Sequence, residues 1–349
     1  MQGMLEGFEA PSTRSADVAR VLVDVDLPHM DRPLDYIVPA GLADAAVVGS
    51  LVRVRLSSAR IDGWIVERTR REVGEGTASL ESVVSSTPVL APSIYETARR
   101  IAARFLATTS QVLSLAIPPR HARAEREARD ENAPTWPTVT SDHVGLGWEA
   151  YPAGEALVSR LRAGESPRAI ATMLRPRLRG CLSEAVASTV ASRRSVIVVT
   201  ATGEQAGRYA RELSEDLSIP VSLAGSEVAA EKRYRLHVAA SLGRVPVVVG
   251  TRSAVWVPCS RLGLIIIVDD GDDRLRERRF PRCDALDVAV QRCAVEGSGL
   301  LVASSARSVK AQALVRSGWA VGIEPTPQAL REATPRVHLY GSTQAEREG

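Results

Sequence analysis

Two short, almost uninterrupted apolar runs, at residues 245–249 and 262–268, restrict the fold of this chain more than any other feature. Both are too short for long helices and are rich in β-branched residues, which is typical of parallel strands buried on both faces. Ligands of open α/β sheets bind beyond the carboxyl ends of the strands. The pattern therefore predicts a doubly wound parallel sheet with a site after the second run, at Asp269, Asp270, Asp272 and Asp273.

Small and hydroxylic residues follow the first run, where Thr251, Arg252 and Ser253 form a loop suited to contact a phosphate backbone. Taken singly, this loop is also an ordinary connection, and the aspartates are also an ordinary solvated turn. The two motifs occur in order at the spacing of one βαβ step, with further strands on either side, which favours the functional interpretation. Together they resemble lobe 1 of superfamily 2 helicases, with the aspartates at the Walker B position.

The composition is that of a globular protein with unusually arginine-rich basic residues. The 349 residues suffice for two or three domains, and the formal net charge is only +3. Of 44 basic residues, only Lys232 and Lys310 are lysine. Arginine is the better bidentate phosphate ligand, although a genome-wide compositional habit explains the same bias.

Zinc, disulfides and membrane insertion are not indicated. Cys181, Cys259, Cys283 and Cys293 are scattered, without paired spacing and without nearby histidines. No apolar stretch approaches the roughly 20 residues of a membrane span, and residues 1–16 lack a signal-peptide core. We therefore expect a cytoplasmic protein without a membrane partner.

The order of strand, helix and turn patterns divides the chain into five parts. Residues 1–16 are expected to be a disordered tail, and 17–120 an independent β-rich domain that ends in helices. Residues 121–147 are expected to be an irregular linker in which 120–131 form at most a short exposed helix. Alternating strands and helices predict a RecA-like domain over 148–325, and 326–349 are expected to be an irregular tail.

The first domain resembles the 3′-end DNA-binding domain of the PriA replication restart (primosomal N′) family, through VARVLVDVDLPHMDRPLDYIVP, VRVRL, DGWIVE and LAIPPRHARA. The resemblance implies a pocket for a DNA 3′ end, with Asp35 accepting a hydrogen bond from the 3′-hydroxyl. Asp35 is also a turn residue suited to cap its own backbone. Leu34 replaces the family's aromatic residue, Ser57 replaces a glycine, and no basic residue lies near Ala78; Tyr36 matches.

The parts that bind nucleotide in active family members are altered here. The phosphate loop G-x-x-x-x-G-K-[ST] is missing, because neither lysine follows a glycine. Residues 164–179 stand in its place, and Pro167 and Pro176 are expected to bracket a helical turn bearing arginines. The family's Asp-Glu-Glu-His becomes Asp-Asp-Gly-Asp from residue 269, and a carboxylate misplaced by about 1 Å costs roughly 10²-fold in rate.

Three functions follow from the resemblance. The first is a DNA-binding protein of replication restart, acting in primosome assembly at stalled forks, that does not hydrolyse ATP; the actinobacterial branch shares the VDDGDD pattern. The second is a weak ATP-dependent 3′–5′ helicase whose second lobe and zinc-binding cysteines lie in a longer chain. The third is a scaffold for other primosome proteins. We expect no catalytic residue, ATP or zinc in this chain, and DNA forks, 3′ ends and single strands as partners.

Overall fold

The computed structural model describes residues 13–132, 135–139, 147–225 and 227–335. An antiparallel sheet forms first, with the strand order β2-β1-β4-β3-β5. Its alternating apolar residues, such as Val21, Val52, Val54 and Ile65, are fully buried in a core of its own. The strands are β1 (Thr13–Val23), β2 (Leu34–Ile37), β3 (Leu51–Leu56), β4 (Ala59–Gly74) and β5 (Ser82–Ser85).

The tail expected over residues 1–16 is wrong in its last four positions. β1 begins at Thr13 and pairs with β4 from that residue onward, since Thr13 lies opposite Gly74 and Ala16 lies opposite Arg71. The physical reason is the length of β4. This strand extends to Gly74 and supplies hydrogen-bond partners for the backbone of residues 13–16, which the sequence pattern of β1 alone does not reveal. Residues 1–12 lie outside the described part of the chain.

The second sheet has the order β12-β6-β11-β10-β7-β9-β8, and every pair that joins these strands is parallel. This arrangement confirms the predicted fold class, a small β-rich domain followed by a RecA-like sheet. The strands are β6 (Arg168–Thr172), β7 (Ser195–Val199), β8 (Val221–Ala224), β9 (Val247–Gly250), β10 (Leu262–Val268), β11 (Gly299–Ser304) and β12 (Val321–Ile323).

Helices cover both faces of the parallel sheet. One face packs against α4, α5 and α6, and the other against α7, α8 and α9. Within the described part of the chain no helix has the length and hydropathy of a membrane span. The bounds are α4 (Gly154–Arg162), α5 (Leu178–Ala191), α6 (Gly203–Leu217), α7 (Ala230–Ser241), α8 (Ala285–Glu296), α9 (Val309–Arg316) and α10 (Pro327–Ala333).

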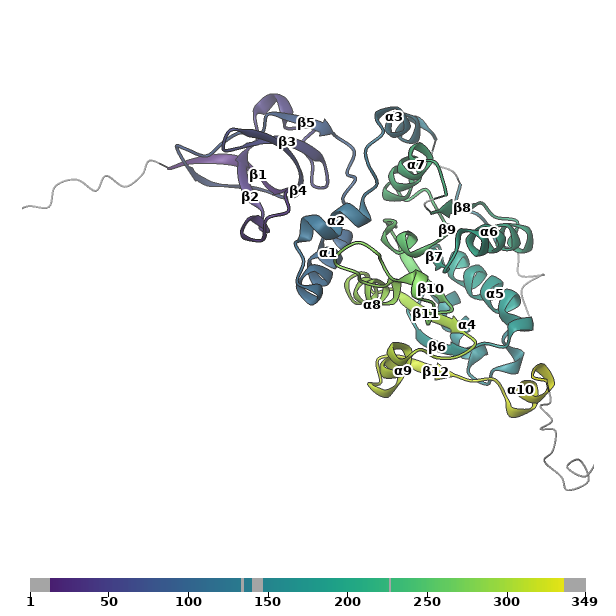
Figure 1. The fold of residues 1–349 in the computed structure, drawn as a ribbon. Coiled ribbons are helices and arrows are strands. Elements are labelled where there is room, and N and C mark those ends of the chain that lie inside the picture. Colours follow the sequence, from purple (N-terminus) through teal and green to yellow (C-terminus); the bar gives the residue numbers. More distant parts are fainter. Residues whose placement is uncertain (1–12, 133–134, 140–146, 226, 336–349) are drawn as a thin grey trace, which may run out of the picture.

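Three further helices join the two sheets: α1 (Pro92–Phe105), α2 (Thr109–Ala116) and α3 (Ala122–Asp130). Figure 1 shows α1 and α2 between the sheets, with α1 against α8 and α3 against α7. Their apolar residues belong to the same core as α7 and α8. Leu22 of β1 and Trp64 of β4 also belong to that core, so the first sheet packs one face on α1–α3 in addition to its own separate core.

Two segments expected to be irregular or exposed are helical, and one of them, α3, is packed against the core. Ala124 and Ala128 of α3 are fully buried, because small residues on one face let that helix lie close to α7. Helix α10 lies in the expected tail; Thr326 caps its first turn and Pro327 opens it, a helix-start pattern that the prediction overlooked. Residues 336–349 lie outside the described part.

A buried carboxylate joins both sheets at α3. Glu125 Oε1 accepts hydrogen bonds from Ser85 Oγ (2.7 Å) at the end of β5 and from Thr87 Oγ1 (3.3 Å). Its Oε2 accepts from Arg120 Nε (2.8 Å) and from the Tyr234 hydroxyl of α7 (3.1 Å). These donors come from three segments, the end of β5, the approach to α3 and α7, so this Glu125 junction ties the first sheet, the connecting helices and the parallel-sheet layer together.

Candidate functional site

The acidic turn after β10 lies at the carboxyl edge of the parallel sheet, beside the end of β11. Ser304 Oγ donates to Asp270 Oδ1 (2.7 Å) and accepts from the Asp270 backbone N–H (2.9 Å). The Oδ2 atom of Asp270 is buried and has no partner among the described residues. Asp270 is thus held by the strand next to its own, and one acceptor oxygen is left over.

Arg175 provides the cation next to this turn. It follows β6, which pairs with β11, and its Nη1 lies 3.3 Å from Asp269 Oδ2. The helical turn expected between Pro167 and Pro176 is wrong, because 168–172 form β6. A neighbouring strand and a short 3-10 helix, η5 (Arg175–Arg177), position the guanidinium, so the arginines here do not share one helical face.

The four aspartates do not converge on one point. Asp269 faces Arg175, whereas Asp272 accepts from its own loop, from the Arg274 backbone N–H at 2.9 Å and from the Arg274 guanidinium. That guanidinium holds the pKa of Asp272 below its ordinary value. Asp273 is exposed. Among the described residues no cluster of three His, Cys, Asp or Glu is placed to hold a metal ion, and Cys181, Cys259, Cys283 and Cys293 are buried thiols.

The chain does not fit the phosphates of a nucleotide at this edge. Between β6 and α5 the backbone runs through Met173-Leu174-Arg175-Pro176-Arg177, where no glycine opens a nest of N–H groups and Pro176 lacks an N–H altogether. At this edge the described residues offer one unpaired carboxylate oxygen, from Asp270, and one guanidinium, from Arg175.

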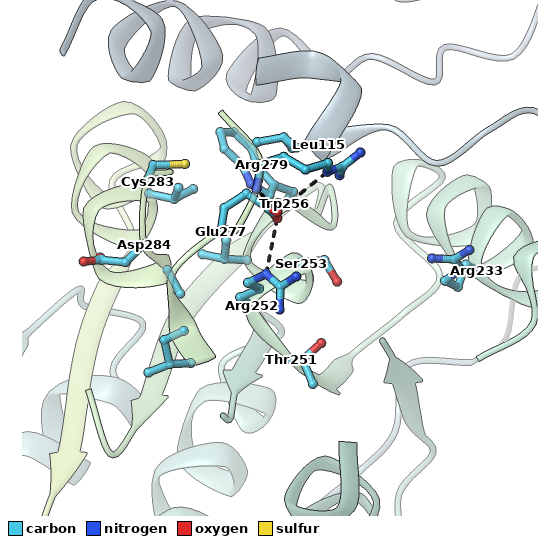
Figure 2. A pocket seen from close by; sticks show the side chains of 14 residues that line it. Leu115, Arg233, Thr251, Arg252, Ser253, Trp256, Glu277, Arg279, Cys283 and Asp284 are labelled. Atoms are coloured by element: carbon cyan, nitrogen blue, oxygen red, sulfur yellow. Dashed lines mark hydrogen bonds and ion pairs between the residues drawn. The ribbon is translucent and has the colours of Figure 1, made fainter. Parts of the chain in front are cut away.

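Thr251, Arg252 and Ser253 follow β9 as predicted and line a cavity of about 130 Å³ (Figure 2). Glycine is required at Gly250, since a Cβ there would collide with the carbonyl oxygen of Ala224. This close approach lets the segment turn into the 3-10 helix η6 (Arg252–Trp256). The three predicted residues are therefore brought together, and they lie at one cavity wall.

Glu277, which the sequence interpretation missed, organises the other wall. Its Oε2 accepts from Arg252 Nε (3.2 Å), and its Oε1 accepts from the backbone N–H groups of Arg278 (2.9 Å) and Arg279 (3.0 Å). Burial raises its pKa, but the Arg279 N–H and the Arg252 guanidinium outweigh that effect and hold the pKa below its ordinary value. The sequence feature that marks Glu277 is that it is the single acidic residue within the basic run 274–282.

The residues predicted for a DNA 3′ end lie on β2 and on the hairpin between β3 and β4. Leu34 and Tyr36 pack into the core of the first sheet, and the Tyr36 hydroxyl donates to the Arg55 carbonyl (3.3 Å). Burial raises the pKa of Tyr36. Ser57 is exposed at the hairpin turn with φ 55°, a left-handed conformation that favours glycine.

Asp35 lies on the opposite face of β2 from Leu34 and Tyr36, because successive strand residues alternate. It forms ion pairs with Arg20 of β1, at 3.7 Å between Nε and Oδ1, and with Arg71 of β4. The expected role of Asp35 as a cap of its own turn is wrong, since it sits within a strand and pairs across the sheet. Its carboxylate is half-buried between two guanidiniums.

Comparisons with known proteins identify relatives of this chain. A family model of the PriA 3′ DNA-binding domain matches residues 20–118. The probable replication restart protein PriA of Mycobacterium tuberculosis (strain CDC 1551 / Oshkosh) is 37% identical over 318 residues, covering 90% of this chain and 48% of that protein. The Mycobacterium leprae protein of the same description is 32% identical, with the same coverage. Among solved structures, the Hef helicase domain of Pyrococcus furiosus aligns with a TM-score of 0.40 at 11% identity, covering 58% of this chain and 43% of that chain.

This chain therefore joins a segment that matches the 3′ DNA-binding domain model of the PriA family to a parallel α/β sheet. The matches confirm the predicted resemblance: the chain is a relative of the PriA replication restart proteins, related over nine-tenths of its length to the mycobacterial members. It spans about half the length of those curated relatives.

Proposed function

We propose that this chain binds DNA in replication restart, at forks and 3′ ends, without hydrolysing ATP. The Arg175–Asp269 ion pair carries the second half of the proposal, because it occupies the edge where a helicase holds the phosphates and metal of ATP. Phosphoryl transfer needs a lysine, a backbone nest and a free carboxylate. At this edge the first two are absent from residues 168–182, and Asp269 is already paired.

Two surfaces are proposed to contact DNA. On the first sheet, Leu34, Asp35, Tyr36 and Ser57 mark the expected 3′-end site, although Asp35 must share its carboxylate with Arg20 and Arg71. On the parallel sheet, Thr251, Arg252 and Ser253 offer hydroxyl and guanidinium donors of the kind that phosphate oxygens accept. Asp269, Asp270, Asp272 and Asp273 are proposed to be a degenerate Walker B turn without a catalytic role.

We propose domains at residues 17–120 and 148–325, and the family match at 20–118 supports the first of them. Other primosome proteins are proposed as partners, as the resemblance to the PriA replication restart family implies. A scaffold with little DNA affinity of its own is the competing function, and DNA binding separates the two.

The proposal is tested by two measurements on the same preparation. Fluorescence anisotropy with a forked oligonucleotide should show binding that weakens as salt rises, because phosphate contacts release counterions. ATP turnover, measured with and without the fork, should stay at the background of a protein-free control. Turnover stimulated by the fork would overturn the inactive site, and no binding at low salt would favour the scaffold.

A further inference from the structure

The cavity beside residues 251–253 is lined by an arginine, Arg233, that forms no ion pair with a described carboxylate. Arg233 of α7 lines this cavity, and its Nε is buried without a hydrogen-bond partner among the described residues. No ion pair of Arg233 with a described carboxylate is found either. Figure 2 shows Arg233 apart from Glu277, with Thr251 and Ser253 in between. The side chain of Arg233 is half-buried, and its buried Nε needs an acceptor that the described part of the chain does not supply.

Arg252 lines the same cavity and has hydrogen-bond donors that no described residue engages. Its Nε is engaged by Glu277, whereas its two terminal nitrogens have no partner in the described part of the chain. A guanidinium held through Nε is fixed in orientation and keeps its outer edge for a planar acceptor. Glu277 therefore acts as a positioning residue for Arg252.

The charge of the cavity wall is positive. Three guanidiniums contribute, from Arg233, Arg252 and Arg279. Of the two carboxylates, Asp284 is paired with Lys310, which leaves Glu277 as the acid that faces the arginines. At about 130 Å³ the cavity is below the size of sites for whole small-molecule ligands, and it suits a single compact anion.

We infer that this cavity binds one phosphate group of a DNA backbone, with Arg233 and the terminal nitrogens of Arg252 as its ligands. The inference rests on the proposed function and extends it, because it adds a residue from α7, 18 positions before the strand-end segment, to the DNA contact. Arg233 supplies the second charge that a tetrahedral anion needs on the side away from Glu277.

The experiment compares two arginines of the same helix. Arg233→Gln should weaken binding of a forked oligonucleotide by about 5- to 10-fold, as expected for the loss of one charge-assisted hydrogen bond. The slope of log affinity against log salt should fall by about 0.9, the value of one phosphate contact. The matched control is Arg235→Gln, since Arg235 is paired with Glu127 and Glu131 and lies outside the cavity.

Arg233→Lys should restore part of the affinity, because the charge is kept and the planar donor set is lost. Equal losses for Arg233→Gln and Arg235→Gln, with an unchanged salt slope, would overturn the inference. Circular dichroism melting of each variant separates a lost contact from a lost fold.

A second arm uses inorganic phosphate alone and does not depend on DNA. At equal ionic strength, phosphate in place of chloride should raise the melting temperature of the wild-type chain but not that of Arg233→Gln. If the wild type binds no DNA, the proposed function fails, and this arm still decides the cavity. Equal stabilisation of both proteins by phosphate would show that Arg233 is not a ligand.

Discussion

The guanidinium of Arg175 lies 3.3 Å from the carboxylate of Asp269, across 94 positions of sequence. The strand order brings the two residues together, because β6 and β10 lie on either side of β11 and both end at the same edge of the sheet. A side chain thus balances the charge of Asp269. In a nucleotide-binding relative, lysine and a metal ion are expected to do so.

Nucleotide should therefore leave the protein unchanged. We expect magnesium and ATP at millimolar concentration to produce no shift in melting temperature, because a ligand that does not bind the folded state does not stabilise it. Titration calorimetry checks the same point directly. Micromolar affinity that disappears in Asp269→Ala and persists in Asp273→Ala would contradict the prediction.

The Asp35 carboxylate should discriminate between DNA ends. A fork with a 3′-hydroxyl is expected to bind more tightly than one with a 3′-phosphate, because Asp35 accepts from the hydroxyl and repels the phosphate. The ion pairs with Arg20 and Arg71 weaken the repulsion, so we expect a preference of about 5- to 10-fold at most. Competition between the two forks at fixed salt measures it.

Asp35→Ala should abolish this preference without abolishing binding, since contacts to the DNA backbone do not depend on the end group. Glu67→Ala is the matched control, because Glu67 also pairs with Arg20 but lies on β4. Equal affinity of wild type for both forks would mean that no working end site exists on β2.

Removal of the Glu125 carboxylate should destabilise the whole chain. Glu125→Ala leaves the buried hydroxyls of Ser85 and Tyr234 without their acceptor and removes the partner of the exposed Arg120, and we expect a loss of about 3 kcal/mol in unfolding free energy. Tyr234→Phe should cost about 1 kcal/mol. Urea denaturation measures both. Glu127→Gln, at an exposed position of the same helix, should be nearly neutral, and a comparable loss there would contradict the role of the junction.

Stability should fall in mild acid because of His237. This side chain is fully buried on α7 with Nε2 at 2.7 Å from the Val89 carbonyl oxygen, and burial lowers its pKa to about 4. The unfolded chain binds a proton near pH 6.5 and the folded chain does not, so stability is complete above pH 6.5 and is lost as the pH falls toward 4. The expected contribution is about 3 kcal/mol. His237→Asn should flatten the difference in unfolding free energy between pH 7 and pH 4.5, and an unchanged difference would contradict it.

Sequence predicted the parallel sheet well where hydrophobicity is continuous. The bounds of β10 follow directly from the uninterrupted apolar run at residues 262–268. The same reasoning misread residues 168–172, because two flanking prolines and several arginines hide a buried strand with only Ala169, Ile170 and Ala171 as its apolar core.

The contacts of the site depend on strand order, which local patterns do not contain. Thr251 and Arg252 were predicted because they follow a strand, yet Glu277, the partner of Arg252, lies in a loop whose sequence is typical of a solvated basic run. In the same way, alternating arginines and acids concealed the buried face of α3 and the role of Glu125. Such residues are recognised only once distant segments are placed side by side.

The Glu125 junction has a consequence for any partner that touches both sheets. Because polar contacts from β5, α3 and α7 meet at one carboxylate, the two candidate DNA surfaces are held at a fixed separation and orientation. A DNA molecule that engages one surface then meets the second at a high effective concentration, with little further loss of rotational freedom. If both surfaces bind DNA as proposed, we expect two weak contacts on such a rigid frame to favour DNA whose branch geometry matches their separation.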